Sequence, residues 1–160
     1  MAGSTSKKVV VYRYDREALT GYVSPPGWLL PEGVQLLSPA GTVAVIPYEE
    51  IKLVCFVRDF EGSKFTQERR LFTSRPKTEG LWVRAQFQDN DFLEGIMANN
   101  LLGLETYGFT LIPPDPATNN QRVFLPRASL RALAVMGVVG SPAHRRRAKA
   151  DRERQIGLFE

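Results

Sequence analysis

Two pairs of carboxylates are the residues of this sequence best spaced for catalysis. Asp15 precedes Glu17 by two residues, and Asp89 stands in the same relation to Asp91. Closely spaced carboxylates can serve as a general acid and a general base. Both pairs, however, lie in short polar segments between apolar runs, where Asp commonly reverses the chain. We therefore interpret Asp15 and Asp89 as structural turn residues.

Other residues capable of chemistry are few. The chain has one histidine, His144, which stands beside three arginines, and one cysteine, Cys55. Because Cys55 lies in an apolar run, it is typical of a small residue buried in a strand. The sequence has no phosphate-binding glycine loop, no Gly-x-Ser-x-Gly and no Cys/His cluster with metal-ligand spacing. We expect a protein that is not an enzyme, with no catalytic residue, no cofactor and no metal site.

Basic residues concentrate in two segments, residues 59–80 and the last twenty residues. The net charge of +4 arises mainly in the second of these. Lysine and arginine side chains in such segments are candidates for contacts with nucleic-acid phosphates. The candidates are Arg69, Arg70, Arg75, Lys77, Arg145, Arg146, Arg147 and Lys149. The alternative for residues 59–80 is a solvated loop or an extra hairpin that packs on a neighbouring domain through Phe65, Leu71 and Phe72.

The last residues carry apolar side chains behind a basic spacer. Gln155, Ile156, Leu158 and Phe159 resemble the bacterial sliding-clamp-binding peptide, usually Gln-Leu-x-Leu-Phe. The resemblance implies that Gln155 is a polar anchor and that Leu158 and Phe159 fill an apolar groove, while Ile156 replaces the usual leucine. The implied partner is the bacterial DNA sliding clamp. The alternative is that Leu158 and Phe159 fold back onto the chain's own β-sheet.

Three blocks of sequence occur twice in the same order, which indicates an internal duplication. The matched pairs are Val9–Val23 with Val83–Met97, Gly33–Pro39 with Gly108–Pro114, and Val45–Lys52 with Phe124–Arg131. Each series contains β-branched and aromatic runs separated by polar turns, a pattern that predicts short strands. Gly21 and Gly95 fall at matching strand positions, where glycine marks a bend or bulge.

The repeats predict an all-β fold of two tandem five-stranded small barrels. We place the first barrel at residues 8–57, a polar connecting segment at 58–80, the second barrel at 81–139, and a flexible or helical basic tail at 140–160. The order of strands and turns resembles the Sm-like and SH3-like small barrels. The stretches "FVRDFEG" and "NNQRVF" are similar to an uncharacterised bacterial domain family that occurs in tandem. At the position of the Arg-Gly turn with which Sm proteins read RNA, this chain has Ile46-Pro47 and Leu125-Pro126.

These observations predict a non-enzymatic adaptor linked to DNA replication or repair by docking of its tail on the sliding clamp. An Sm-like RNA-binding protein and a regulatory protein-interaction module without a nucleic-acid role are the alternatives. The sequence has no run long enough for a membrane span and no signal peptide, so we expect a soluble, cytoplasmic protein. Asn119 and Asn120 are further candidates for partner binding, and Trp28 is expected either partly exposed or as a plug over the first barrel.

Overall fold

The computed structural model describes residues 6–140 and 149–152, and strands dominate this part of the chain. The all-β prediction is confirmed. The strands are β1 (Lys7–Arg13), β2 (Leu19–Val23), β3 (Leu29–Leu30), β4 (Gly33–Leu37), β5 (Val43–Ile46), β6 (Ile51–Val57), β7 (Gly80–Phe87), β8 (Phe92–Met97), β9 (Gly108–Leu111), β10 (Asn120–Pro126) and β11 (Leu130–Val139). Short 3₁₀ turns are η1 (Tyr48–Glu50), η2 (Phe65–Gln67), η3 (Leu101–Gly103) and η4 (Arg127–Ser129), and residues 149–152 form one helical turn.

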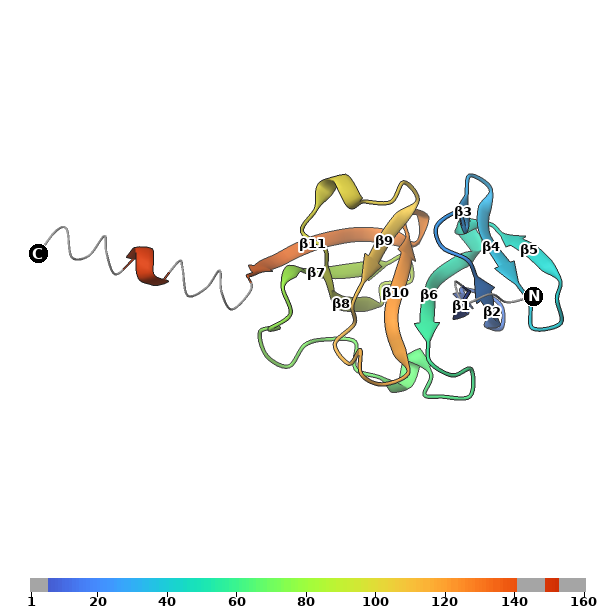
Figure 1. Cartoon of the computed structure of the whole chain (residues 1–160), viewed down its shortest axis with the longest axis horizontal. Coiled ribbons are helices and arrows are strands. Elements are labelled where there is room, and N and C mark those ends of the chain that lie inside the picture. The colour runs from blue at the N-terminus through green and yellow to red at the C-terminus, as the bar shows by residue number, and fades with distance from the viewer. Residues whose placement is uncertain (1–5, 141–148, 153–160) are drawn as a thin grey trace, which may run out of the picture.

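Both halves of the chain have the same strand order. In the first unit the order is β6-β1-β2-β4-β5, with the short β3 paired to β4. In the second it is β11-β7-β8-β9-β10, where β8 and β9 meet through the bridge between Ile96 and Ile112. Each unit curls into a small barrel-like sheet, and a 3₁₀ turn, η1 or η4, separates its last two strands (Figure 1).

The register of pairing is also repeated. Val9 lies opposite Gly21 and Phe56, and its match Val83 lies opposite Gly95 and Val135. A β-bulge interrupts the pairing of first and fifth strands at the same step in both units. This agreement of register confirms the duplication inferred from the repeated blocks.

Gly21 of β2 lies where this strand crosses β4 at close range. Gly95 of β8 lies where that strand crosses the end of β9 in the same way. A Cβ added at Gly21 would lie 2.6 Å from the carbonyl oxygen of Leu37, and one at Gly95 would lie 2.9 Å from that of Ile112. No other residue has a small enough side chain for this approach. Both glycines therefore have the structural role that their matched positions predict.

The two units are joined edge to edge, which the sequence did not indicate. β10 of the second unit pairs antiparallel with β6 of the first, so that one sheet runs from β3 through β6 and β10 to β9. In Figure 1 these two strands stand side by side at the centre of the molecule. The two units therefore share a sheet and form one continuous body, instead of two separate domains joined only by a linker.

The continuous apolar sequence of β6 follows from this junction. Val54 and Phe56 point into the core of the first unit, whereas Leu53, Cys55 and Val57 point into the core of the second. A strand covered on both faces reads as an uninterrupted apolar run instead of an alternating one.

Within the described residues no helix is long and apolar enough to cross a bilayer.

Candidate functional site

One partly apolar surface hollow lies between the first unit and the connecting segment. Its volume is about 220 Å³. Apolar side chains from β1, β6 and the connecting segment form much of its wall, and polar groups join them at the mouth. The lining residues are Val10, Tyr12, Ala18, Thr20, Val57, Phe60, Gly62, Ser63, Lys64 and Asn119. We call this hollow the linker groove.

A second hollow of about 210 Å³ lies further along the same unit. It is lined by Tyr22, Ser24, Trp28, Gln35, Leu37 and Val43. Thr20 lines the first hollow and Tyr22 the second, and residues two apart on a strand share one face. Tyr22 packs edge-on against Phe60, with 5.5 Å between ring centroids, so an aromatic pair separates the two hollows.

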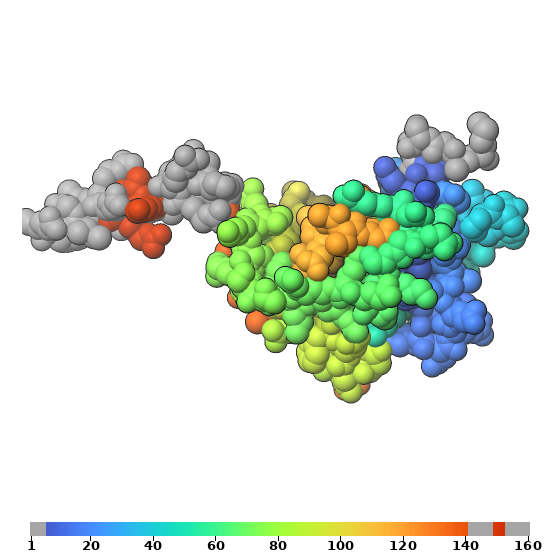
Figure 2. All heavy atoms as spheres, turned by 90° about the horizontal axis from the view of Figure 1, so that it is seen from below, coloured from blue at the N-terminus to red at the C-terminus, as the bar shows by residue number. Residues whose placement is uncertain are grey.

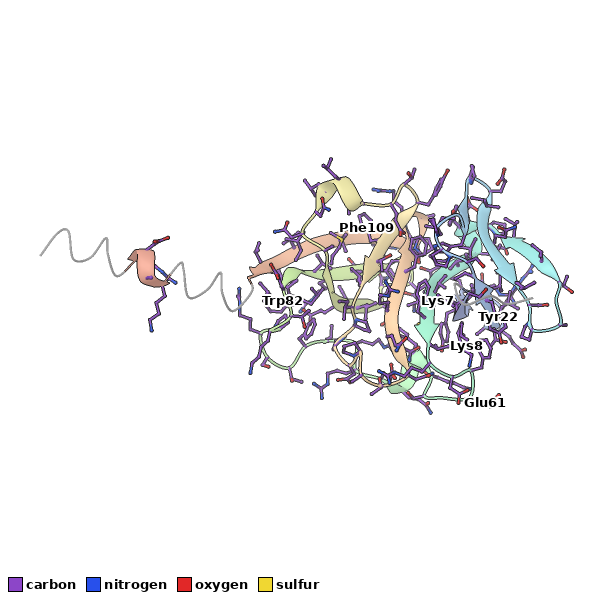
Figure 3. The ribbon with its side chains drawn as sticks, viewed as in Figure 1. Lys7, Lys8, Tyr22, Glu61, Trp82 and Phe109 are labelled. Carbon is purple, nitrogen blue, oxygen red and sulfur yellow. The ribbon has the colours of Figure 1, made fainter. Side chains whose placement is uncertain are left out.

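Charges of both signs surround the linker groove. The Lys8 ammonium lies 5.7 Å from the centre of the Phe60 ring, in cation–π range. Glu61 follows Phe60 in the connecting segment and is exposed. Figure 3 labels Lys8 and Tyr22 in the first unit and Glu61 in the connecting segment beside it, away from Trp82 and Phe109 in the second unit. A mouth with mixed charges does not favour phosphate over other ligands.

Glu68 fastens the first part of the connecting segment to the loop before β10. Its carboxylate accepts hydrogen bonds from the side chains of Ser63, Thr118 and Asn120 and from the backbone of Asn119. Burial raises the pKa of Glu68, but these hydrogen bonds outweigh it and hold the pKa below its ordinary value. Figure 2 shows the result, with the green atoms of the connecting segment bordering the orange atoms near β10.

The same network explains Asn119 and Asn120. The Asn119 side chain accepts from the backbone of Asp59 and donates to the carbonyl of Ser63, and Asn120 is buried beside Glu68. The Asn119 amide is thus bonded within the protein and positions one wall of the groove, while the side-chain nitrogen of Asn120 is bonded to Glu68. The alternative interpretation of these residues as partner contacts is not supported by their hydrogen bonds.

Glu94 holds the second part of the connecting segment. It is buried, and its carboxylate accepts hydrogen bonds from the backbone of Phe72 (2.9 Å) and from the indole of Trp82 (3.1 Å). Arg84 lies 3.4 Å from the same carboxylate. Phe65 of the connecting segment is buried in the second core. Of the three apolar residues that the loop alternative for residues 59–80 named, Phe65 is buried and Phe72 packs on Trp82, whereas Leu71 is exposed.

The structure does not bring the basic candidates of the connecting segment together as a phosphate site. Arg70 forms an ion pair with Asp91, and Arg75 donates to the carbonyl of Val138 (3.0 Å). Arg69 is exposed and lies 3.9 Å from Asp115. Lys77 and Lys149 are exposed.

The carboxylate pairs have different surroundings in the two units. Asp15 is exposed in the first turn, whereas Asp89 and Asp91 both accept hydrogen bonds from Lys52 of the first unit, at 2.7 and 2.9 Å. Burial raises the pKa of Asp89 and Asp91, but the hydrogen bonds from Lys52 and from the backbone, together with the charge of Lys52, outweigh it, and both pKa values lie below the ordinary one. The Asp89 carboxylate also accepts from the backbone of Asp91, as expected of a turn residue.

The part of the chain that the structure describes offers no metal site. No set of three or more His, Cys, Asp or Glu side chains is arranged to hold a metal ion in that part of the chain. Burial raises the pKa of the Cys55 thiol well above its ordinary value, so its reactive thiolate form is suppressed. The linker groove could not be predicted from the sequence. Its walls come from segments that are far apart in the chain, and the residues of each segment form no recognisable motif.

Trp28 is buried and closes one end of the first unit. Its ring packs edge-on against Phe56 and against Phe124 of the second unit, at centroid distances of 5.4 and 5.1 Å. Of the two interpretations of this residue, partial exposure is not what the structure shows, because Trp28 belongs to the first core. The tail residues Gln155, Ile156, Leu158 and Phe159, together with Arg145, Arg146 and Arg147, lie outside the described residues.

Comparison with known proteins yields one match. A model described as a family of unknown function, DUF6982, covers residues 5–137, which is most of the chain. Neither the curated proteins nor the solved structures contain a match.

Proposed function

The chain belongs to the DUF6982 family, and we propose that it is a non-enzymatic adaptor whose body binds a segment of another protein in the linker groove. The observation that carries this proposal is the pair of partly apolar hollows on either side of Tyr22 and Phe60. An extended peptide places successive side chains on opposite faces, so alternate residues of one segment can fill neighbouring hollows.

The size of the hollows favours a peptide over a cofactor. At about 220 and 210 Å³, each is smaller than the roughly 300 to 1,000 Å³ typical of a site that encloses a whole small ligand. A hollow of this size accommodates one or two side chains. The polar groups at the mouth, among them the exposed Lys64, are suited to contacts with a peptide backbone.

Protein is also favoured over nucleic acid as the partner of the body. Nonspecific binding to DNA or RNA depends on several cations that are free to meet phosphates. In the connecting segment, Arg70 is paired with a carboxylate and Arg75 is bonded to a backbone carbonyl. Ile46-Pro47 and Leu125-Pro126 offer no cation where Sm proteins have their Arg-Gly turn.

The test compares two alanine-to-arginine variants. Ala18→Arg places a long side chain in the linker groove, and Ala40→Arg makes the same change at an exposed position outside both hollows. Partners recovered from a cell extract should be lost with Ala18→Arg and kept with Ala40→Arg, with or without nuclease treatment. Loss of the partners on nuclease treatment would instead favour the RNA-binding alternative.

The tail gives the adaptor its second contact. We base this part of the proposal on the likeness of Gln155–Phe159 to the sliding-clamp-binding peptide. A short peptide depends on a few anchors, so replacing both Leu158 and Phe159 with alanine should weaken clamp binding by about 2 kcal/mol or more. Titration of the bacterial sliding clamp with the full chain and with this double variant measures the difference. Equal binding by both proteins would contradict the clamp hypothesis.

A further inference from the structure

The junction between the two units shows how one strand edge of this fold is covered. β6, the fifth strand of the first unit, pairs with β1 on one edge and with β10 on the other. The count leaves out the short β3, which has no equivalent in the second unit. On the same count, β10 is the fourth strand of the second unit. A fifth strand of one unit therefore binds a fourth strand of the next, and the contact is head-to-tail because it uses different strands on the two sides.

The matching edges at the two ends of the body have no such partner among the described residues. β11 is the repeat of β6 and pairs only with β7, whereas β5 is the repeat of β10 and pairs only with β4. Figure 1 shows the two strands at opposite ends of the body, with β5 in the first unit and β11 in the second. The molecule thus has one covered junction, between β6 and β10. The two strand edges that would form a second junction of the same kind, on β11 and β5, are both open in the part of the chain that the structure describes.

Residues that are buried at the junction have exposed apolar matches on the open edges. Phe56 is 8% exposed, whereas its match in β11, Val135, is 59% exposed. Phe124 is 0% exposed, whereas its match in β5, Val45, is 42% exposed. Because the pairing within each unit follows the same register, the difference comes from what else packs on these side chains. Across the junction, Phe124 of β10 packs on Trp28 of the first unit, and Arg122 of β10 lies over Phe56.

The open edges have few of the features that keep strand edges apart, although β11 has a bulge between Val135 and Gly137, at the end of the stretch that the β6–β10 register would use. Exposed edges are usually protected by charged side chains, prolines or bulges along their length. β5 reads Val-Ala-Val-Ile, and β11 from Ala132 to Val139 contains no charged residue and no proline. An uninterrupted apolar strand is the pattern seen in β6, which is covered on both faces.

We propose that a second copy of this chain covers these edges, with β5 of one copy paired antiparallel to β11 of the next. Repeating the β6–β10 register places Val43 opposite Val135, Ala44 opposite Ala134 and Val45 opposite Leu133. The contact buries on each copy the apolar side chains that the isolated chain exposes. Since the two surfaces differ, each copy keeps one open edge and further copies add in the same sense, giving a closed ring or a filament.

The hydrogen bond of Arg75 is compatible with this pairing. Its guanidinium caps the carbonyl of Val138, two residues beyond the last β11 position that the register uses, Met136. The edge from Leu133 to Met136 is therefore left for a neighbouring strand.

Two variants test the proposal by blocking one edge each. Ala44 and Ala134 are exposed in the single chain, so Ala44→Glu and Ala134→Glu leave the fold intact. In a contact with the β6–β10 register they would occupy the positions of Val123 and Cys55, both 0% exposed, so each glutamate would be buried without a partner. Self-association of either variant should weaken by at least about 100-fold. Leu102→Glu, at an exposed apolar residue on η3 and away from both edges, is the matched control.

Sedimentation of the full chain over a wide range of concentrations is the measurement. The unaltered protein and Leu102→Glu should form assemblies larger than a dimer, whereas Ala44→Glu and Ala134→Glu should each remain monomeric. An equimolar mixture of the two edge variants should form a one-to-one heterodimer, because the mixture retains one intact β5 and one intact β11. A monomeric unaltered protein, or self-association of either edge variant as strong as that of the control, would overturn the proposal. Circular dichroism confirms that each variant is folded.

Discussion

The fifth strands of the two units have the same pairing within their units and different surroundings outside them. β6 is buried on both faces between two cores, whereas β11 leaves Val135, Met136 and Val138 exposed. The duplicated backbone fixes which residues lie opposite one another. Burial, and with it the energetic importance of a side chain, depends instead on what packs against the strand from outside the unit.

The largest expected effect contrasts matched positions on the two fourth strands. Phe124→Ala removes a fully buried ring that packs on Trp28 and should cost about 3 to 5 kcal/mol of unfolding free energy. Val45→Ala, at the matched exposed position, should cost less than about 0.5 kcal/mol in the monomer. Urea unfolding of both variants gives the comparison. Similar losses would show that the junction does not distinguish the two strands.

The matched glycines should respond alike, because they make the same crossing. A methyl group at Gly21 or Gly95 meets a backbone carbonyl at less than 3 Å, so each alanine variant should lose about 1 to 3 kcal/mol. Gly103→Ala is the control, since the nearest atom to its Cβ is an Asn100 side-chain nitrogen at 3.4 Å. Thermal unfolding monitored by circular dichroism measures all three. A neutral Gly95→Ala would remove the equivalence of the two crossings.

Glu68 should make the free energy of unfolding depend on pH, because its pKa is lower in the folded protein than in the unfolded chain. The contribution is complete above the ordinary carboxyl pKa and is lost as pH falls through the lower folded value. Glu68→Gln should therefore cost about 1 to 2 kcal/mol at neutral pH and less in acid. Urea unfolding at neutral pH and at acidic pH measures the loss of unfolding free energy, with Asp15→Asn as the control. A loss that is equal at both pH values would exclude the charge of Glu68 as the cause.

The smallest effect concerns the two turns. Asp91 accepts from Lys52 and Arg70, whereas the matched Glu17 has only its backbone carbonyl bonded, to Arg13. Since the side chains of Asp91 and Arg70 are about one-third exposed, Asp91→Asn should cost less than about 1 kcal/mol. Glu17→Gln should have no measurable effect. High salt should reduce the difference between the two variants, and a difference that is insensitive to salt would argue against an ionic origin.

The sequence predicted what is repeated within each unit. Val9 and Val83, with Gly21 and Gly95, mark the same register because each unit must satisfy the same crossing of strands. The turn role of Asp89 was also predictable from residue type. These features depend on neighbours close in the chain, and local patterns record them.

The sequence did not predict what joins the units or forms the groove. The apolar run of β6 is equally typical of a core strand in a separate barrel, so the pairing with β10 left no distinct mark. Tyr12, Phe60 and Asn119 come from three segments and meet only in the folded chain. Arg70 and Asn120 were candidates for ligand binding because their partners, Asp91 and Glu68, are distant in sequence.

The pairing of β6 with β10 has a consequence for synthesis on the ribosome. All strands of the first unit have been made once Val57 has emerged, but the second edge of β6 and the place of Phe124 in the first core stay open until Asn120–Pro126 has been translated. At roughly 5 to 20 residues per second, that interval lasts several seconds, which is longer than the folding time of most small domains. During this time a nascent chain presents the apolar edge of β6 to neighbouring nascent chains on the same messenger RNA. Cotranslational chaperone binding at this stage would protect the edge until the chain's own β10 arrives.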